Sequence, residues 1–329
     1  METESAVTHA PATDTVELKF TGQAGEYFRI WIVNICLSIV TLGIYSAWAK
    51  VRRKRYFYGC TLLNDSAFEY LGDPKVILKG RVIVFVVFVA YALLKEIHPL
   101  VAVALTLAFL ALLPWVLVRA LQFNARNSAH RNVRFGFSCS IGGMAGFLLL
   151  PILAVPLSLG LAYPYYLYAK RKFFLEHSAY GSTPFSFSAS VGAYYLCALK
   201  VLLAFVGFLI GSVITFGIGA LPLYILVRTY SEAAFSRIEW RNTALADVRF
   251  DCAWTAGGLF KLYLVNGLGI LFSVGLLAPW AAVRTARYKL GGIALHPAGR
   301  LGGFLAAAQD QVSAVGDETG ELLGFDFGL

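Results

Sequence analysis

One segment of this sequence recurs without gaps, and it is long and apolar enough to be a membrane element. Residues 25–59 match residues 257–291 at several glycines, at a tryptophan and at two arginines. A weaker third copy, at residues 142–176, lies 117 positions after the first. Internal repetition of an apolar segment indicates a membrane protein assembled from one unit used several times.

The composition supports a membrane protein of many crossings. Hydrophobic residues make up 58% of the 329 residues and charged residues only 14%, whereas soluble domains carry about 25% charged residues. Apolar stretches of about 20 residues match the thickness of a bilayer. The candidate membrane segments are 28–48, 82–94, 99–118, 144–168, 191–208, 209–227 and 262–283. We therefore expect an all-α polytopic membrane protein with about seven membrane helices in internal repeats.

Each copy of the repeated segment contains a helix break. Gly43, Gly160 and Gly275 follow the first apolar helix, and Pro164 and Pro279 then begin the second helix of two copies. Glycine after one helix and proline in the first turn of the next are the expected stop and start signals. The second helix is highly charged in the first copy and is expected to lie in the headgroup layer.

Short strands are expected at the membrane face. Aromatic and polar residues alternate at residues 18–22, 68–72, 134–138, 184–190 and 249–253, as in half-exposed strands. Residues 61–70 predict a hairpin, because Asn64, Asp65 and Ser66 favour a turn. Lipid does not accommodate open strand edges, so these strands must lie outside the hydrocarbon.

The pattern divides the chain into five parts. We expect a disordered N-terminal tail at 1–15, a first repeat at 16–136, a second repeat at 137–249, a third repeat at 250–300 that holds the membrane element only, and an acidic tail at 301–329. Each of the first two repeats combines the membrane element with a helical hairpin.

Two membrane topologies fit these segments. Seven crossings would put the N-terminus outside the cytoplasm and give the cytoplasmic side the larger share of lysines and arginines. In the other topology the repeated element dips into the membrane and returns, which places every basic loop and every aromatic strand in the cytoplasm. We favour seven crossings.

Three sequence phrases resemble a known family. They are TLGIYSAWAKVRRKRYFYGCTLL at residues 41–63, FEYLGDPKVILKGR at 68–81 and GDETGELLGFDFGL at 316–329. Their order is similar to that of the YjgN-like family of bacterial inner-membrane proteins, a domain of unknown function. The resemblance implies location in the bacterial inner membrane as a multi-pass protein, and it implies no activity.

Catalytic signatures are absent from the sequence. It contains no HExxH, GxSxG or P-loop motif and no paired carboxylates in an apolar segment. The histidines and cysteines lack metal-ligand spacing. We expect no enzyme activity, no cofactor and no metal.

Three polar residues within apolar segments are candidates for a substrate site. Lys200 lies deep in its segment, where a charge is costly and often functional, although its side chain could instead snorkel to a headgroup. Asn34 and Asn266 occupy the same place in two copies. Such amides either bind a polar substrate or join neighbouring helices by hydrogen bonds.

The basic clusters are expected to be anchors at the membrane interface. They comprise Lys50, Arg52, Arg53, Lys54, Arg55, Lys170, Arg171, Lys172, Arg284 and Arg287.

The expected partners are membrane lipids and an unidentified membrane protein, with a homo-oligomer also open and nucleic acid excluded. Two functions remain: a transporter or channel for a small polar or anionic solute, or a membrane scaffold without catalytic activity.

Overall fold

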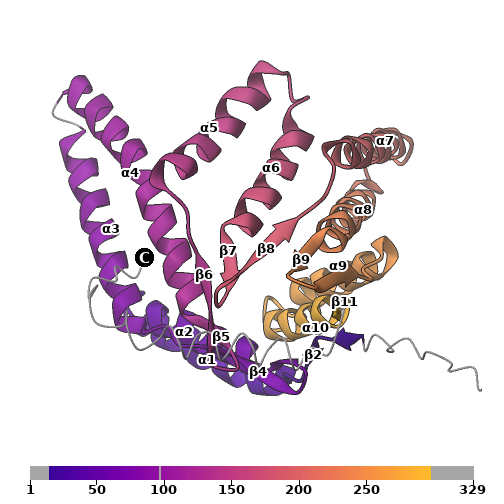
Figure 1. Cartoon of the computed structure of the whole chain (residues 1–329), viewed down its shortest axis with the longest axis horizontal. Helices are drawn as coiled ribbons and strands as arrows, with labels where there is room; N and C mark the ends of the chain where they lie inside the picture. Colours follow the sequence, from indigo (N-terminus) through magenta and orange to yellow (C-terminus); the bar gives the residue numbers. More distant parts are fainter. Residues whose placement is uncertain (1–14, 96–97, 298–329) are drawn as a thin grey trace, which may run out of the picture.

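The computed structural model describes residues 15–95 and 98–297 of the chain. Ten helices in this part form five antiparallel hairpins that radiate from a ring of short strands (Figure 1). The hairpins are α1 (Ala24–Val40) with α2 (Ser46–Gly59), α3 (Pro74–Leu94) with α4 (Pro99–Arg126), α5 (Ile141–Leu157) with α6 (Tyr163–Glu176), α7 (Val191–Ile214) with α8 (Ala220–Arg241), and α9 (Ala256–Phe272) with α10 (Ala278–Gly291).

Eleven short strands form one antiparallel sheet in the described part of the chain. They are β1 (Val16–Glu17), β2 (Lys19–Phe20), β3 (Thr61–Leu63), β4 (Ser66–Tyr70), β5 (Ser128–His130), β6 (Val133–Phe137), β7 (Ser178–Tyr180), β8 (Thr183–Phe187), β9 (Thr243–Leu245), β10 (Val248–Cys252) and β11 (Ile293–Pro297). The order across the sheet is β1-β11-β10-β9-β8-β7-β6-β5-β4-β3-β2. Only Leu18 separates β1 from β2, so the two ends of the sheet are consecutive pieces of one extended segment. We call this closed arrangement the strand ring.

The strand ring corrects the predicted fold class. The chain is not an all-α protein with seven membrane crossings, because one sheet joins all five hairpins, and only three helices in the described residues are long and apolar enough to cross a membrane. These three are α3, α4 and α7. The two strands that flank each of the five hairpins pair with each other, so a hairpin must leave and re-enter the ring on one side. The sequence shows the strands but not that they pair with one another across the hairpins.

Local sequence explains the short β-hairpins. Asn64 and Asp65 have φ of +49° and +58°, and they form the turn between β3 and β4. Asparagine and aspartate tolerate this left-handed region better than most residues. The predicted hairpin at residues 61–70 is therefore confirmed, with Leu62 opposite Ala67 and Leu63 opposite Ser66.

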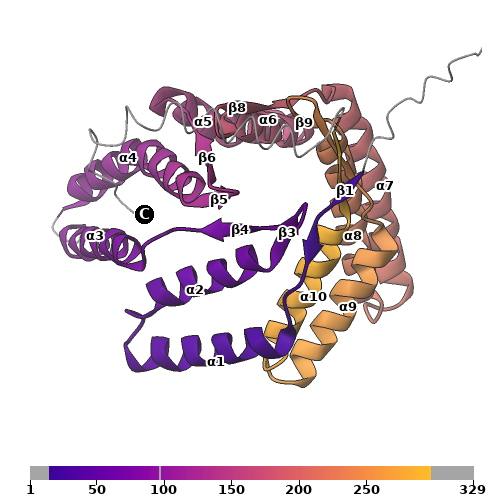
Figure 2. The same ribbon diagram turned by 60° about the horizontal axis from the view of Figure 1, so that its bottom comes forward.

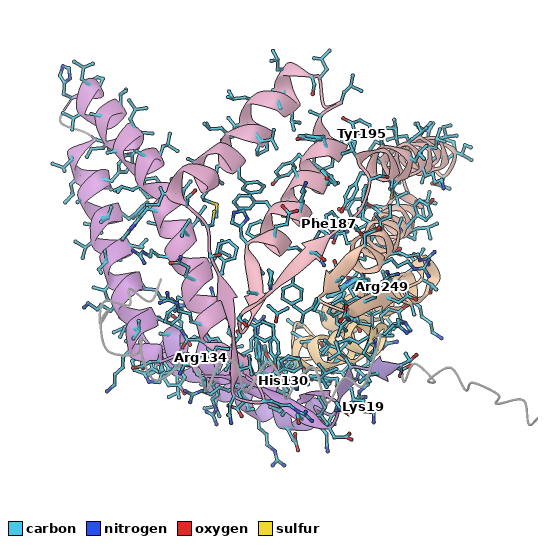
Figure 3. The ribbon with its side chains drawn as sticks, in the orientation of Figure 1. Lys19, His130, Arg134, Phe187, Tyr195 and Arg249 are labelled. Carbon is cyan, nitrogen blue, oxygen red and sulfur yellow. The ribbon has the colours of Figure 1, made fainter. Side chains whose placement is uncertain are left out.

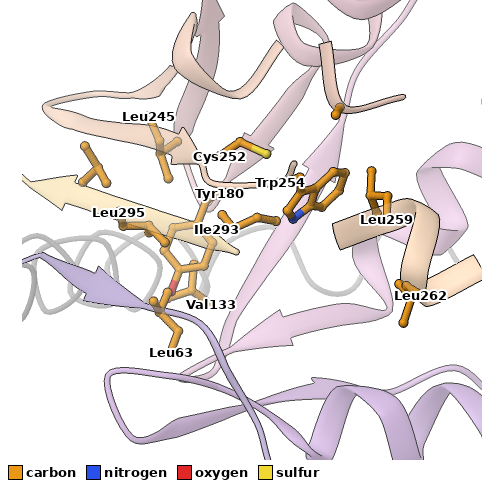
Figure 4. Close-up of a cluster of buried hydrophobic side chains, with 12 residues drawn as sticks. Leu63, Val133, Tyr180, Leu245, Cys252, Trp254, Leu259, Leu262, Ile293 and Leu295 are labelled. Carbon is orange, nitrogen blue, oxygen red and sulfur yellow. The ribbon is translucent and has the colours of Figure 1, made fainter. Parts of the chain in front are cut away.

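The inside of the strand ring is a hydrophobic core. Residues that face each other across neighbouring strands share its inner face, for example Phe135 with Tyr180 and Phe185 with Leu245. Side chains from distant strands meet in the same buried cluster, which includes Leu63, Val133, Tyr180, Leu245, Ile293 and Leu295 (Figure 4). Because packed side chains occupy the interior, the ring is a structural hub for the hairpins.

Four of the five hairpins end in the same kind of turn. In the first, the Thr41 hydroxyl donates to the carbonyl of Leu37 (2.6 Å) and accepts from the backbone N–H of Tyr45 (2.9 Å). Gly43 then adopts φ +90°, which an L-residue with a side chain rarely adopts. The other three turns have a serine or threonine followed two positions later by a glycine, as in Ser158–Gly160, Thr215–Gly217 and Ser273–Gly275.

Candidate binding groove

A groove of about 1510 Å³ separates the first and last helical hairpins. Its walls come from α1 and α2 on one side and from α9 and α10 on the other, and α3 contributes Arg81. Figure 2 shows α1 and α2 beside α9 and α10, the two hairpins that flank the seam where β1 meets β2. The first and last hairpins of the described fold therefore lie side by side at the seam of the strand ring.

The groove is strongly basic. Lys50, Arg53, Lys54 and Arg81 line it, and no aspartate or glutamate is among its lining residues. The ammonium of Lys54 donates to Oδ1 of Asn124 (2.7 Å), and the Arg81 guanidinium donates to the Ser46 hydroxyl. Those two cations therefore have neutral partners, which leave their charge uncompensated.

The other two cations have no partner at all among the described residues. Neither Lys50 nor Arg53 forms an ion pair or a hydrogen bond with a residue that the structure describes. Four uncompensated positive charges in one concave surface attract an anion strongly, since the walls have a lower dielectric constant than water.

Asn34 and Asn266 both lie in the groove, one in each wall. Asn34 is 8% exposed, and its Oδ1 atom is buried without a hydrogen-bond partner. Asn266 is 5% exposed and fully engaged: its Nδ2 donates to Thr285 Oγ1 (3.0 Å), and its Oδ1 accepts from Arg284 (3.4 Å). The two amides therefore differ, because Asn266 joins α9 to α10 while the buried Oδ1 of Asn34 has no partner among the described residues.

The rest of the groove is mainly apolar. Trp31, Ile35 and Ile39 of α1 face Ile270 and Pro279 from the opposite hairpin. A ligand that satisfies both parts of this surface carries a negative group for the cations and a hydrocarbon portion for the apolar walls. A hydroxyl or amine next to the negative group would fill the free acceptor of Asn34.

Lys200 lies apart from this groove. It sits on α7, its side chain is exposed, and it is not among the lining residues. The structure therefore brings together two of the three residues that the sequence suggested for a substrate site. Exposure on an apolar helix is the geometry expected when a lysine snorkels toward a headgroup.

The predicted interface anchors divide into two groups. Lys50, Arg53 and Lys54 line the groove, whereas several others bond to protein groups. Arg55 donates to the carbonyls of Tyr70 and Gly72, and Arg287 donates to the carbonyl of Gly22 (2.8 Å). Three more of the predicted anchors contact protein groups: Arg171 pairs with Glu239, Lys172 pairs with Glu176, and Arg284 lies over the ring of Trp280. Arg52 and Lys170 complete the predicted set.

The helix-break glycines and the predicted segment boundaries have simple positions in the structure. Gly43, Gly160 and Gly275 lie in hairpin turns with φ of +90°, +89° and +90°. The predicted N-terminal tail at 1–15, apart from Thr15, and the acidic tail at 301–329 lie outside the described residues.

Sequence reasoning missed Arg81, and it ended the first helix of the predicted hairpin at residue 208, whereas α7 continues to Ile214. Arg81 is the last charge before the apolar stretch of α3, and only the fold places it opposite α2. The turn at Thr215–Gly217 carries the same residue pattern as Thr41–Gly43, so a search for this short pattern would have located the turn of this hairpin.

His130 is the polar group that lies deepest in the strand ring. It is 1% exposed, its Nε2 lies 3.3 Å from the carbonyl oxygen of Leu63, and Tyr180 donates to its backbone carbonyl (3.0 Å). Burial lowers the pKa of His130 below its usual value and raises the pKa of Tyr180 to about 12. Both groups are therefore neutral at physiological pH and act as part of the core. No group of three metal-ligating side chains occurs in residues 15–95 and 98–297.

The fold defines a class of membrane protein in which helical hairpins radiate from a closed ring of short strands. A family model described as "Bacterial protein of unknown function (DUF898)" matches residues 15–222 and 211–322. The chain belongs to this family. No solved structure matches it.

Curated relatives agree with the family and give the location. The chain is 32% identical over 259 residues to Inner membrane protein YjgN of Escherichia coli K12, a match that covers 77% of this chain and 56% of the relative. The protein of the same name from Escherichia coli O157:H7 is 30% identical over 254 residues, with the same coverage. That of Salmonella typhimurium is 36% identical over 125 residues, which cover 38% of this chain and 32% of the relative. The chain thus spans about half the length of the Escherichia coli relatives, and it is a protein of the bacterial inner membrane.

Proposed function

We propose that this protein binds an anionic amphiphile in the groove between its first and last hairpins, as the substrate site of a transporter. The observation that carries the proposal is the set of four cations with no carboxylate among the groove-lining residues. The buried, unpartnered Oδ1 of Asn34 supports it, because a buried acceptor without a partner is costly unless a ligand supplies the donor.

The packed interior of the strand ring favours a carrier over a channel through the ring. Buried side chains from opposite strands meet there, so a solute has to move along the hairpins. The groove is suited to this, because its two walls belong to separate hairpins. Movement of one wall against the other would release a bound solute.

A binding measurement tests the site directly. Short-chain phosphatidylglycerol, which carries a phosphate, hydroxyls and hydrocarbon, is titrated into the purified protein in neutral detergent, and binding is measured by calorimetry. Short-chain phosphatidylcholine serves as the zwitterionic comparison. We expect the double variant Lys50→Gln with Arg53→Gln to weaken phosphatidylglycerol binding at least about tenfold, since about 1.4 kcal/mol corresponds to a factor of ten.

A matched control separates a built site from general attraction. Lys170 and Lys172 occupy the positions in α6 that correspond to Arg53 and Arg55 in α2, and they lie outside the groove. The variant Lys170→Gln with Lys172→Gln should bind as the unmodified protein does. Equal losses in both double variants, or no loss in the groove variant, would refute the proposed site.

A flux measurement tests transport. Proteoliposomes that contain the protein should take up the bound anion, and the groove variant should not. Binding without flux would instead favour the second candidate function, a membrane scaffold, which is also compatible with a packed strand ring that holds the hairpins in place.

A further inference from the structure

The tips of four hairpins are apolar and almost completely exposed. The residue at the top of each turn is Leu42, Leu159, Phe216 or Val274, with exposed fractions of 95%, 95%, 95% and 91%. Isolated exposed apolar residues are common on proteins, but here each tip continues an exposed apolar helix surface. In a protein of the inner membrane, hydrocarbon is the environment that such tips fit.

Strand pairing decides how a hairpin can meet the membrane. The strand before α5–α6 pairs with the strand after it, with Phe135 opposite Tyr180. The same holds for α7–α8, where Phe185 lies opposite Leu245. Both ends of a hairpin therefore lie on the same side of the membrane, and the hairpin either crosses twice or enters and returns.

Charges set the depth that each hairpin can reach. On the second helix of four hairpins, the first charge follows soon after the turn: Lys50 in α2, Lys170 in α6, Arg228 in α8 and Arg284 in α10. At 1.5 Å per residue these charges lie only about 6 to 12 Å from the start of their helices. A bilayer core is about 30 Å thick, so these second helices cannot cross it.

The helix α7 shows why length alone is insufficient. Its 24 residues are long enough to cross a membrane. Its antiparallel partner α8, however, carries Arg228 and Glu232 in its middle. Because a chain that crossed in α7 would have to cross back in α8, the hairpin α7–α8 enters and returns.

The hairpin α3–α4 is different in both respects. Its tip carries Lys95 and His98 in place of apolar residues. From Pro99 to Val118, α4 has no charge over 20 residues, which span about 30 Å. Both α3 and α4 are long and apolar enough to cross. α4 therefore matches the bilayer with polar groups beyond each side, and α3 pairs with it through an uncharged stretch at residues 82–94 that ends before Lys95.

The charges also give the orientation. Among the lysines and arginines of residues 15–95 and 98–297, Lys95 is the only one in a hairpin tip. The others lie on the strands, in the turn between β5 and β6, or along the helices on the ring side of the tips; Lys19, Arg134 and Arg249 are examples on the strands (Figure 3). Lysine and arginine concentrate on the cytoplasmic side of inner-membrane proteins.

We propose that the strand ring lies at the cytoplasmic face, that α3–α4 is the hairpin that crosses the membrane, and that the other four hairpins enter from the cytoplasm and return without crossing.

Single-cysteine labelling in membranes tests all three parts. Lys95→Cys, Phe216→Cys and Asp247→Cys are each treated with a membrane-impermeant maleimide, and labelling is scored above that of the unmodified chain with its own cysteines. Asp247 is an exposed residue of the β9–β10 turn and reports on the ring. Denaturation in SDS shows that each new thiol is reactive once lipid is removed.

The expected pattern is different for each position. Lys95→Cys should label in spheroplasts, Asp247→Cys should label only in inverted vesicles, and Phe216→Cys should label in neither until SDS is added. Labelling of Phe216→Cys from either side would overturn the return of that hairpin within the membrane. Labelling of Lys95→Cys only in inverted vesicles would overturn the crossing, and labelling of Asp247→Cys in spheroplasts would overturn the orientation.

Discussion

A single carboxylate joins the last two hairpins, and its replacement should destabilise the fold measurably. Glu232 of α8 accepts from the Lys289 ammonium (2.6 Å) and from the Tyr263 hydroxyl (2.9 Å), and it lies 3.5 Å from Arg228. Its side chain is only 13% exposed, whereas that of Lys289 is 31% exposed. The perturbation is Glu232→Gln, which retains the shape and removes the charge.

The magnitude follows from what glutamine retains. Its carbonyl can still accept from Tyr263, but the charge-assisted bond from Lys289 is lost, and such bonds contribute about 1.5 to 3 kcal/mol. Lys289 keeps contacts with the rings of Trp254 and Tyr263 and remains partly in solvent, which limits the penalty. We expect the free energy of unfolding to fall by about 2 kcal/mol.

Unfolding in mixed micelles, titrated with SDS and followed by circular dichroism, measures this loss. The matched control is Glu176→Gln, which removes the exposed pair with Lys172 at 3.9 Å and should cost less than about 0.5 kcal/mol. A double-mutant cycle with Lys289→Met should show coupling of about 1 kcal/mol or more. Additive losses, or a Glu232→Gln variant as stable as the parent, would refute this account of the contact.

Two further predictions concern the strand ring and the hairpin turns. Burial lowers the pKa of His130 in the folded protein. As pH falls, the unfolded chain therefore binds a proton at this histidine first, and the free energy of unfolding should decline below about pH 6.5. His130→Gln should flatten this slope between pH 7 and 5; in that range Asp251 stays charged, because its hydrogen bond from Arg241 lowers its pKa. Gly43→Ala should cost about 1 to 2 kcal/mol in the same unfolding assay, because an alanine at φ +90° is strained, while Gly25→Ala within α1 should be neutral or stabilising.

Much of the local structure could be predicted from the sequence. Glycine after an apolar helix predicted the turns at Gly43, Gly160 and Gly275, and alternation of aromatic and polar residues predicted the strands near Phe68 and Phe185. These features depend on neighbours in the chain, so a local pattern is sufficient to reveal them.

The closure of the ring and the groove depend on distant residues. Nothing near Val16 indicates that it pairs with Leu295, and strand ends of two or three residues carry too little pattern to specify a partner. The predicted number of membrane crossings was wrong for the same reason. Only the pairing of the strands shows that both ends of a hairpin lie on the same side of the membrane. Asn34 was a candidate from its repeated position, whereas Arg81, which lines the same groove, comes from another hairpin.

The seam of the strand ring has a consequence for the order of events during synthesis. β1 leaves the ribosome first among the strands, and its partner β11 is the last of those described to be made. Until β11 emerges, the edges of β1 and β10 lack the partner they share, and unpaired edges invite association with other chains. Ring closure therefore waits until β11 has been synthesised, so a chain truncated before residue 293 would carry two permanently open edges although all its groove-lining residues are present.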